Sequence, residues 1–273
     1  MKIKVPKTIQ EFADTKNYLA PNVLYSFGYA ISEYDISKAN INILRSFGKI
    51  TESDYLKLLA LPKIDREVEI GKRILIDWSI QETIDKGIAA AKLQFLTLNN
   101  IDPNTILRIA NDAFYLTGNN YIPYTTVIPE GGSTPIQFLF KKKFNFYMKL
   151  NSVLFFCNDE GAEWDVDVIG IGNVNLEMHH EFISFLCNVA NQYIYCGKQS
   201  AIKYVNEFHR QYINNELNIR YYREFNANSS FKYCQGNNDY LSYIPIGGAN
   251  EKFLDRSYNL NLIRTIYSYL LAS

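Results

Sequence analysis

Apolar and polar residues repeat with two different periods along this chain, and these periods predict its secondary structure. Residues 79–98 place apolar side chains three or four positions apart, as on one face of a helix. These side chains are Ile84, Ile88, Ala91, Phe95 and Leu98. A shorter helix is expected after Thr51, which stands three residues before Asp54 as in a capping box, and it should stop at Pro62. A strand over residues 30–36 is expected to lead into this helical part.

Alternating residues predict strands in the middle of the chain. Residues 105–120 favour a β-hairpin or two adjoining strands. Further strands are expected within 136–150, 152–156 and 164–171. After Gly172 the apolar residues return to helical spacing, in the three segments 175–196, 198–217 and 253–273. The order of strand, helices, strands and helices indicates an α+β fold with a helical second part.

The composition narrows the class of protein. Of the 273 residues, 47% are hydrophobic and 15% are aromatic, which argues against disorder. The formal net charge is zero, so a site for a polyanion must come from local clusters of cations. The chain lacks an apolar run of the roughly 18 residues that a membrane span needs, and its start lacks the apolar core of a signal peptide. Its four scattered cysteines are typical of reduced thiols, so we expect a cytoplasmic protein without a membrane partner.

Two aspartates are the candidates for catalysis. Asp35 ends an apolar strand, and Asp112 lies between the apolar runs of the expected hairpin. If both face one point, their charges repel unless a divalent cation lies between them. Paired carboxylates, completed by water and substrate phosphates, commonly hold Mg²⁺, and two such ions assist phosphoryl transfer. The alternative is that each aspartate is a surface residue of a turn or a helix cap.

The order of motifs around these aspartates resembles that in the palm and thumb of family B DNA polymerases. YDISKANINIL (34–44) is similar to the first catalytic motif of that family, with Asp35 at its metal-binding aspartate. Residues 84–116 resemble the helix, turn and strand that lead to the second metal-binding aspartate, which Asp112 matches. KKKF (141–144) is similar to a later strand that touches primer–template, and the segments that follow resemble the first helices of the thumb.

The resemblance implies a polymerase-like palm, an antiparallel sheet with helices, over residues 1–172, with a short fingers insertion at about 45–80. Residues 173–273 would form a helical thumb-like region and a tail. Ala110 replaces one aspartate of the second motif, and the part before residue 30 is too short for the amino-terminal domains of the family. We therefore expect a reduced relative from a bacteriophage or mobile element, in the cytoplasm of its host.

The fingers-like insertion offers cations for a nucleoside triphosphate. Lys63, Arg66 and Arg73 share an arc of about 80° on a helix, and they could bind the β- and γ-phosphates. The alternative is a solvated helix face whose cations are balanced by acidic neighbours. Those neighbours are Asp65, Glu67 and Glu69.

Asn40 raises the question of sugar selection. In the family a tyrosine at this place blocks a 2′-hydroxyl group, and asparagine is smaller and can form a hydrogen bond with that hydroxyl. The resemblance therefore implies tolerance of ribonucleotides, which would suit a primase or an RNA-synthesising role. The alternative is an asparagine that only caps the helix after the strand.

A basic strand is the candidate contact for nucleic acid. Lys142, Lys143 and Phe144 could place cations against phosphates and a ring against a base or sugar. The alternative is a solvated edge strand with protective lysines.

Together these features predict metal-dependent, template-directed nucleotidyl transfer. Asp35 and Asp112 would bind two Mg²⁺ or Mn²⁺ ions, and the partners would be primer–template and nucleoside triphosphates. A split enzyme with a second polymerase subunit is one alternative. A non-catalytic nucleic-acid-binding or interaction protein with a degenerate palm is the other.

Overall fold

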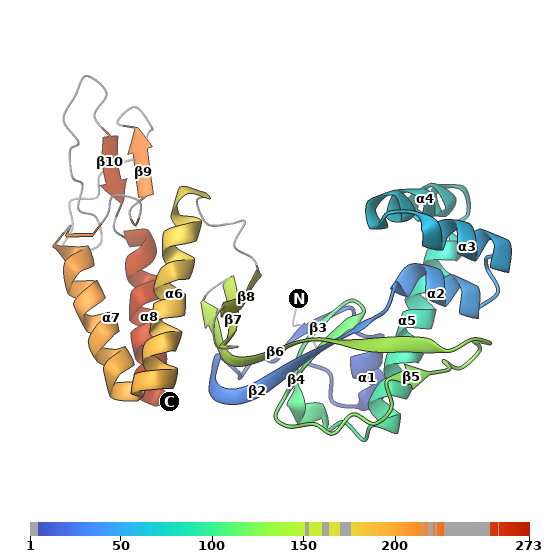
Figure 1. Ribbon diagram of the computed structural model, residues 1–273, viewed down its shortest axis with the longest axis horizontal. Helices are drawn as coiled ribbons and strands as arrows, with labels where there is room; N and C mark the ends of the chain where they lie inside the picture. The colour runs from blue at the N-terminus through green and yellow to red at the C-terminus, as the bar shows by residue number, and fades with distance from the viewer. Residues whose placement is uncertain are drawn as a thin grey trace. The chain divides into compact units, whose positions relative to one another are not determined.

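The computed structural model describes residues 5–150, 153–159, 164–169, 176–214, 216–217, 221, 223–226, 252–255 and 257–273. The chain forms two compact units, and both contain antiparallel strands and helices (Figure 1). The first unit comprises Met1–Val23 and Ala30–Lys143, and the second comprises Leu24–Tyr29 and Phe144–Ser273. This confirms the α+β class, while the palm, fingers and thumb stay predictions.

Five strands form the main sheet of the first unit. Their order is β1, β3, β4, β2 and β6, and the short β5 pairs with β6. The bounds are Asn17–Leu19 for β1, Tyr25–Ile36 for β2, Ile106–Ala110 for β3, Ala113–Thr117 for β4, Thr126–Val127 for β5 and Ile136–Leu150 for β6. β3 and β4 are the predicted hairpin, joined through Asn111 and Asp112. Strands β2 and β6 each contribute residues to both units.

The helices of the first unit begin and end largely where local signals place them. Their bounds are Ile9–Asp14 for α1, Ala39–Ser46 for α2, Glu52–Ala60 for α3, Lys63–Ile76 for α4 and Ser79–Leu98 for α5. The Thr51 side chain accepts a hydrogen bond from the backbone N–H of Asp54, so the predicted cap of α3 is confirmed. At Gly87 a methyl group would collide with Ile43, so glycine allows α5 to approach α2 closely.

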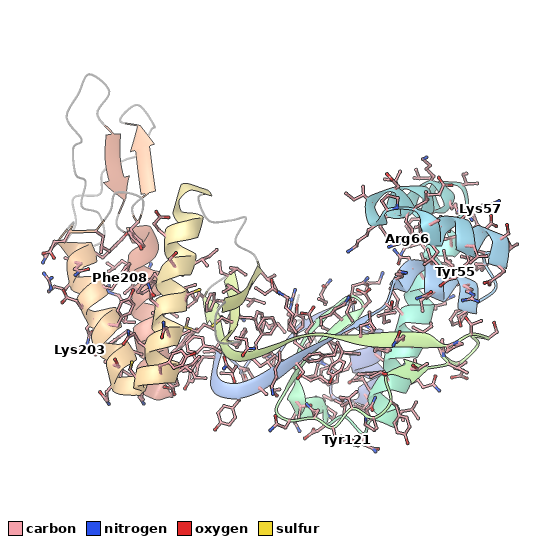
Figure 2. The ribbon with its side chains drawn as sticks, in the orientation of Figure 1. Tyr55, Lys57, Arg66, Tyr121, Lys203 and Phe208 are labelled. Atoms are coloured by element: carbon pink, nitrogen blue, oxygen red, sulfur yellow. The ribbon has the colours of Figure 1, made fainter. Side chains whose placement is uncertain are left out.

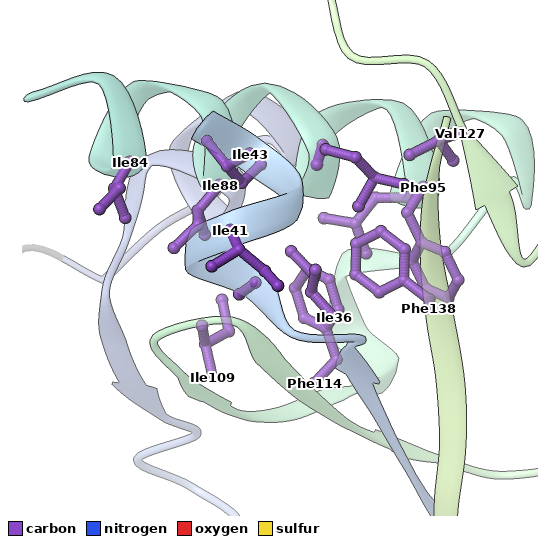
Figure 3. Close-up of a cluster of buried hydrophobic side chains, with 14 of the residues drawn as sticks. Ile36, Ile41, Ile43, Ile84, Ile88, Phe95, Ile109, Phe114, Val127 and Phe138 are labelled. Atoms are coloured by element: carbon purple, nitrogen blue, oxygen red, sulfur yellow. The ribbon is translucent and has the colours of Figure 1, made fainter. Parts of the chain in front are cut away.

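One aromatic cluster joins α5 to the sheet (Figure 3). The ring of Phe95 stacks on Phe138 of β6 at 4.2 Å and on Phe114 of β4 at 5.8 Å, measured between ring centroids. Ile84 and Ile88, from the predicted apolar face of α5, are buried in the same cluster. Leu98 was expected on that face, but 39% of it is exposed. Packing against α5 therefore holds β4, which begins directly after Asp112.

The second unit has its own core. It contains part of β6, the strands β7 (Val153–Asp159) and β8 (Trp164–Ile169), and three longer helices, which are α6 (Leu176–Cys196), α7 (Lys198–Ile213) and α8 (Ser257–Ala272). A small hairpin pairs β9 (Arg223–Asn226) with β10 (Lys252–Asp255). Phe208 of α7, labelled in Figure 2, stacks on Phe185 of α6 with 3.9 Å between the ring centroids. In the described ranges, none of the helices has both the length and the apolarity to cross a bilayer.

Candidate metal centre

The sheet brings Asp35 and Asp112 together at the end of the β3–β4 hairpin. Asp35 is the register partner of Ala113, the residue after Asp112. The backbone N–H of Ile36 donates a hydrogen bond to the carbonyl oxygen of Asp112 at 3.3 Å. Neighbouring strands lie about 4.8 Å apart, so the two carboxyl groups come from directly adjacent chain segments.

The raised pKa of Asp112 has burial as its main cause and includes a contribution from the neighbouring carboxyl group of Asp35. Burial raises the pKa of Asp112 to about 6, with further increases from the negative charge of Asp35 and from a hydrogen bond between the two carboxyl groups. Such a hydrogen bond needs a shared proton, because two carboxylates both lack a donor. Replacing this proton by a divalent cation would relieve the same repulsion.

The donor set fits a hard cation with few protein ligands. In the described part of the chain, no group of three or more histidine, cysteine, aspartate or glutamate side chains lies together in a way that could hold a metal ion. A metal at Asp35 and Asp112 would thus have two carboxylates and complete its coordination with water and substrate oxygens. Mg²⁺ and Mn²⁺ accept such a set, whereas structural Zn²⁺ needs nitrogen or sulfur ligands.

Lys141 of β6 is a neighbour of this site that the sequence analysis missed. Its Nζ lies 3.7 Å from Oδ2 of Asp35, and 41% and 30% of the two side chains are exposed. An ion pair this open to solvent is worth about 1 kcal/mol or less, so Lys141 can leave Asp35 when a stronger cation binds. The KKKF motif begins at Lys141, but the expectation from it named the next two lysines, Lys142 and Lys143.

Lys92 of α5 is the second residue that was missed. Only 1% of it is exposed, and its Nζ donates hydrogen bonds to the carbonyl oxygens of Thr15 at 2.7 Å and Asn111 at 3.1 Å. Burial lowers the pKa of Lys92 to about 8, although the charges of Asp112 and Asp14 act in the opposite direction. Its sequence signal was a lysine among the apolar residues of a helix.

The three cations expected at the triphosphate have different surroundings on α4. Arg66, labelled in Figure 2, is 7% exposed, and within the described residues its guanidinium has neither a hydrogen bond nor an ion pair. Arg73 lies 3.8 Å from Glu69 and 4.0 Å from Asp54. Lys63 is exposed at the start of the helix. The alternative of charge balance by acidic neighbours thus describes Arg73, whereas Arg66 is buried without an acidic partner among the described residues.

Asn40 connects α2 to α4. Its Nδ2 donates a hydrogen bond to Oε2 of Glu67 at 2.6 Å. The capping alternative for Asn40 is wrong, because Lys38 occupies the N-cap position of α2 with a φ of 46°. The contact places the second turn of α4 beside α2, the helix that follows Asp35 in the chain.

The basic strand presents its side chains differently from the expectation. Lys143 is exposed and Lys142 is half-buried. Phe144 is fully buried, and its ring lies 5.3 Å from that of Phe156. A buried ring offers no face to a base, so a contact of Phe144 with nucleic acid is not available in this structure, and its burial instead serves the core.

Comparison with known families places the chain. The family model described as Bacteriophage PBS1 gene 130 protein matches residues 8–272. The chain belongs to this family. No curated protein matches it in sequence. The gene 130 family takes its description from a bacteriophage, which supports the phage connection expected from the sequence, whereas a kinship with family B polymerases stays a prediction.

Proposed function

We propose that this gene 130 family member catalyses metal-dependent, template-directed nucleotidyl transfer at Asp35 and Asp112. One observation supports the proposal above the others. Asp35 of β2 and Asp112 of the β3–β4 turn come from adjacent chain segments. Burial, with the negative charge of Asp35 as the second cause, raises the pKa of Asp112 to about 6. Perturbed carboxyl pairs of this kind are characteristic of functional sites, because stability alone would favour their separation.

In the proposed reaction the 3′-hydroxyl oxygen of a primer attacks the α-phosphorus of a nucleoside triphosphate. The new P–O bond forms as the bond to pyrophosphate breaks, and the hydroxyl proton passes to water. Asp35 and Asp112 would hold Mg²⁺ or Mn²⁺, which supplies electrostatic stabilisation of the attacking and leaving oxygens. The chain's own task is to hold the two carboxylates together at the end of the β3–β4 hairpin.

Arg66 is the residue best suited to bind the triphosphate. A guanidinium stays charged at all relevant pH values and binds phosphate oxygens through paired N–H groups. Arg66 is on α4, and the next residue of that helix, Glu67, accepts a hydrogen bond from Asn40 of α2. Arg73 would need to leave Glu69 and Asp54 before it could assist.

A non-catalytic nucleic-acid-binding protein is the second candidate. The ion pair of Lys141 with Asp35 favours it, because it neutralises one carboxylate without a metal. Exposed Lys143 on the same strand would then contact phosphates. In this case binding of primer–template would weaken with salt, and metal would not affect it.

Primer extension with Mg²⁺ or Mn²⁺ decides between the two candidates. The wild type is compared with Asp35→Asn, Asp112→Asn and the control Asp102→Asn, which changes an exposed aspartate that caps a 3-10 turn. We expect each of the first two changes to lower kcat at least 100-fold, and the control to retain activity, since asparagine caps as well as aspartate.

The result that would overturn the proposal is extension that neither Asp35→Asn nor Asp112→Asn reduces. Absence of extension in the wild type, together with salt-sensitive binding of primer–template, would instead support the non-catalytic candidate. A second subunit that copurifies and restores extension would indicate the split enzyme.

A further inference from the structure

We propose that Lys92 is a positioning residue that holds the turn at Asn111 and Asp112 where Asp112 can share a cation with Asp35. The inference rests on the metal-dependent function proposed above and extends it to a residue that does not touch substrate. It gives a function to the buried ammonium group of Lys92, which contacts the turn of the β3–β4 hairpin.

Lys92 connects three segments of the first unit. It projects from α5, and its ammonium group donates to the carbonyl of Thr15, the residue after α1, and to the carbonyl of Asn111 in the hairpin turn. Because the side chain is 1% exposed, water cannot readily replace either contact. The ammonium group therefore fixes the turn to two helices that belong to the core.

Both backbone polar groups of Asn111 are bound. Its N–H donates to the carbonyl of Lys16 at 2.6 Å, and its carbonyl accepts from Lys92 at 3.1 Å. Its φ of 52° lies in the left-handed region, which asparagine adopts more readily than most residues. Asp112 follows directly, and its own carbonyl accepts from Ile36. The backbone position of Asp112 is thus held by hydrogen bonds to Asn111 and to Asp112 itself.

Stability alone gives a weak reason to keep a lysine here. Burying an ammonium group costs several kcal/mol, and apolar residues of similar volume often replace buried charges without loss of stability. Methionine would fill the same space in α5, but it would leave two carbonyl groups without this donor. What lysine adds over methionine is control of the turn, together with a positive charge near Asp112.

The test compares Lys92→Met with Lys86→Met. Lys86 is on the same helix, but its side chain is exposed and lies 3.8 Å from Glu82 in an ordinary helix pair. Binding of Mn²⁺ is measured by electron paramagnetic resonance, and amide hydrogen exchange is followed at Asn111. Loss of an outer ligand-supporting contact typically weakens metal binding 10- to 100-fold. For Lys92→Met we expect about 10-fold weaker Mn²⁺ binding and faster amide exchange at Asn111. Its kcat should be lower, with an unchanged KM for the nucleotide. Lys86→Met should show none of these changes.

Lys92→Arg keeps a charged donor and guards against a variant that merely folds poorly. If Lys92→Met misfolds, Lys92→Arg becomes the test. We expect Lys92→Arg to bind Mn²⁺ with an affinity within about threefold of the wild type, because removing such a contact altogether costs at least about 10-fold. Wild-type affinity for Mn²⁺ in a folded Lys92→Met, or Mn²⁺ binding that arginine does not recover, would overturn the inference.

Failure of this inference differs from failure of the proposed function. A wild type that binds Mn²⁺ but extends no primer, with weaker binding in Lys92→Met, would overturn the polymerase reaction and retain the positioning role. If the wild type shows metal-dependent primer extension and Lys92→Met extends primers equally well, the polymerase reaction is retained and the positioning role of Lys92 is overturned. A wild type that binds no Mn²⁺ would overturn both.

Discussion

Replacing Asp112 by asparagine removes a carboxyl group whose ionised form is destabilised in the folded protein by burial and by the charge of Asp35. Burial and the charge of Asp35 raise the pKa of this group from 3.8 to about 6. The folded state therefore keeps a proton between about pH 4 and 6 that the unfolded chain has lost, and stability falls as pH rises through this window. Below it, both states are protonated and the stability that accompanies the raised pKa is fully present.

The magnitude follows from this difference in pKa. At about 1.36 kcal/mol per pKa unit the ceiling is about 3 kcal/mol, and partial exposure to solvent reduces it to about 1–2 kcal/mol. Asparagine has nearly the shape of a protonated aspartate but does not titrate. We expect Asp112→Asn to unfold with a free energy about 1–2 kcal/mol higher than the wild type at pH 8 and with an equal one at pH 4.

Urea denaturation at both pH values, without metal, measures this difference. Asp102→Asn is the control and should stay within about 0.5 kcal/mol of the wild type at both pH values. Adding Mg²⁺ at ten times its dissociation constant should stabilise the wild type by about 1.4 kcal/mol and leave Asp112→Asn unchanged. An Asp112→Asn protein that is less stable than the wild type at pH 8 would refute the reasoning, because the carboxyl pair would then be stabilising.

Three further changes test the surroundings of the site. Arg66→Gln should raise the KM for nucleoside triphosphates about 10-fold with an intact fold, since one phosphate contact is worth about 1.4 kcal/mol; an unchanged KM would remove Arg66 from the nucleotide site. Lys141→Ala should tighten Mn²⁺ binding by up to about fivefold, because it removes a competing ion pair of about 1 kcal/mol, and calorimetry showing weaker binding would contradict this. Asn40→Tyr should increase discrimination against ribonucleotides in primer extension, whereas a wild type that already excludes them as strictly as a tyrosine-gated polymerase would rule out the role of Asn40.

Local signals predicted the secondary structure well. The hairpin around Asn111 follows from two apolar runs on either side of polar residues, and α3 follows from the Thr51 cap and the stop at Pro62. These features depend on neighbours within a few positions, so a single sequence contains them. The proximity of Asp35 and Asp112 was predicted from their places on two strands, and the register of β2 with β4 sets Asp35 opposite Ala113, the residue after Asp112.

Contacts between distant segments were harder to predict. Lys92 was missed because its partners, Thr15 and Asn111, are backbone carbonyls and leave no trace in side-chain patterns. Phe144 was expected at the surface from its lysine neighbours, but β6 passes there from exposed to buried positions. The change occurs in the middle of a strand, where the alternation of residues gives no sign of it.

The left-handed backbone of Asn111 has a consequence for sequence variation in the family. Glycine reaches a φ of 52° without strain and aspartate at small cost, whereas valine and isoleucine would collide with their own backbone. In a saturation library at this position, active clones should be restricted to asparagine, glycine and aspartate. Position 102, which caps the 3-10 turn and is not one of the two carboxyl groups of the site, should accept a broader set of replacements.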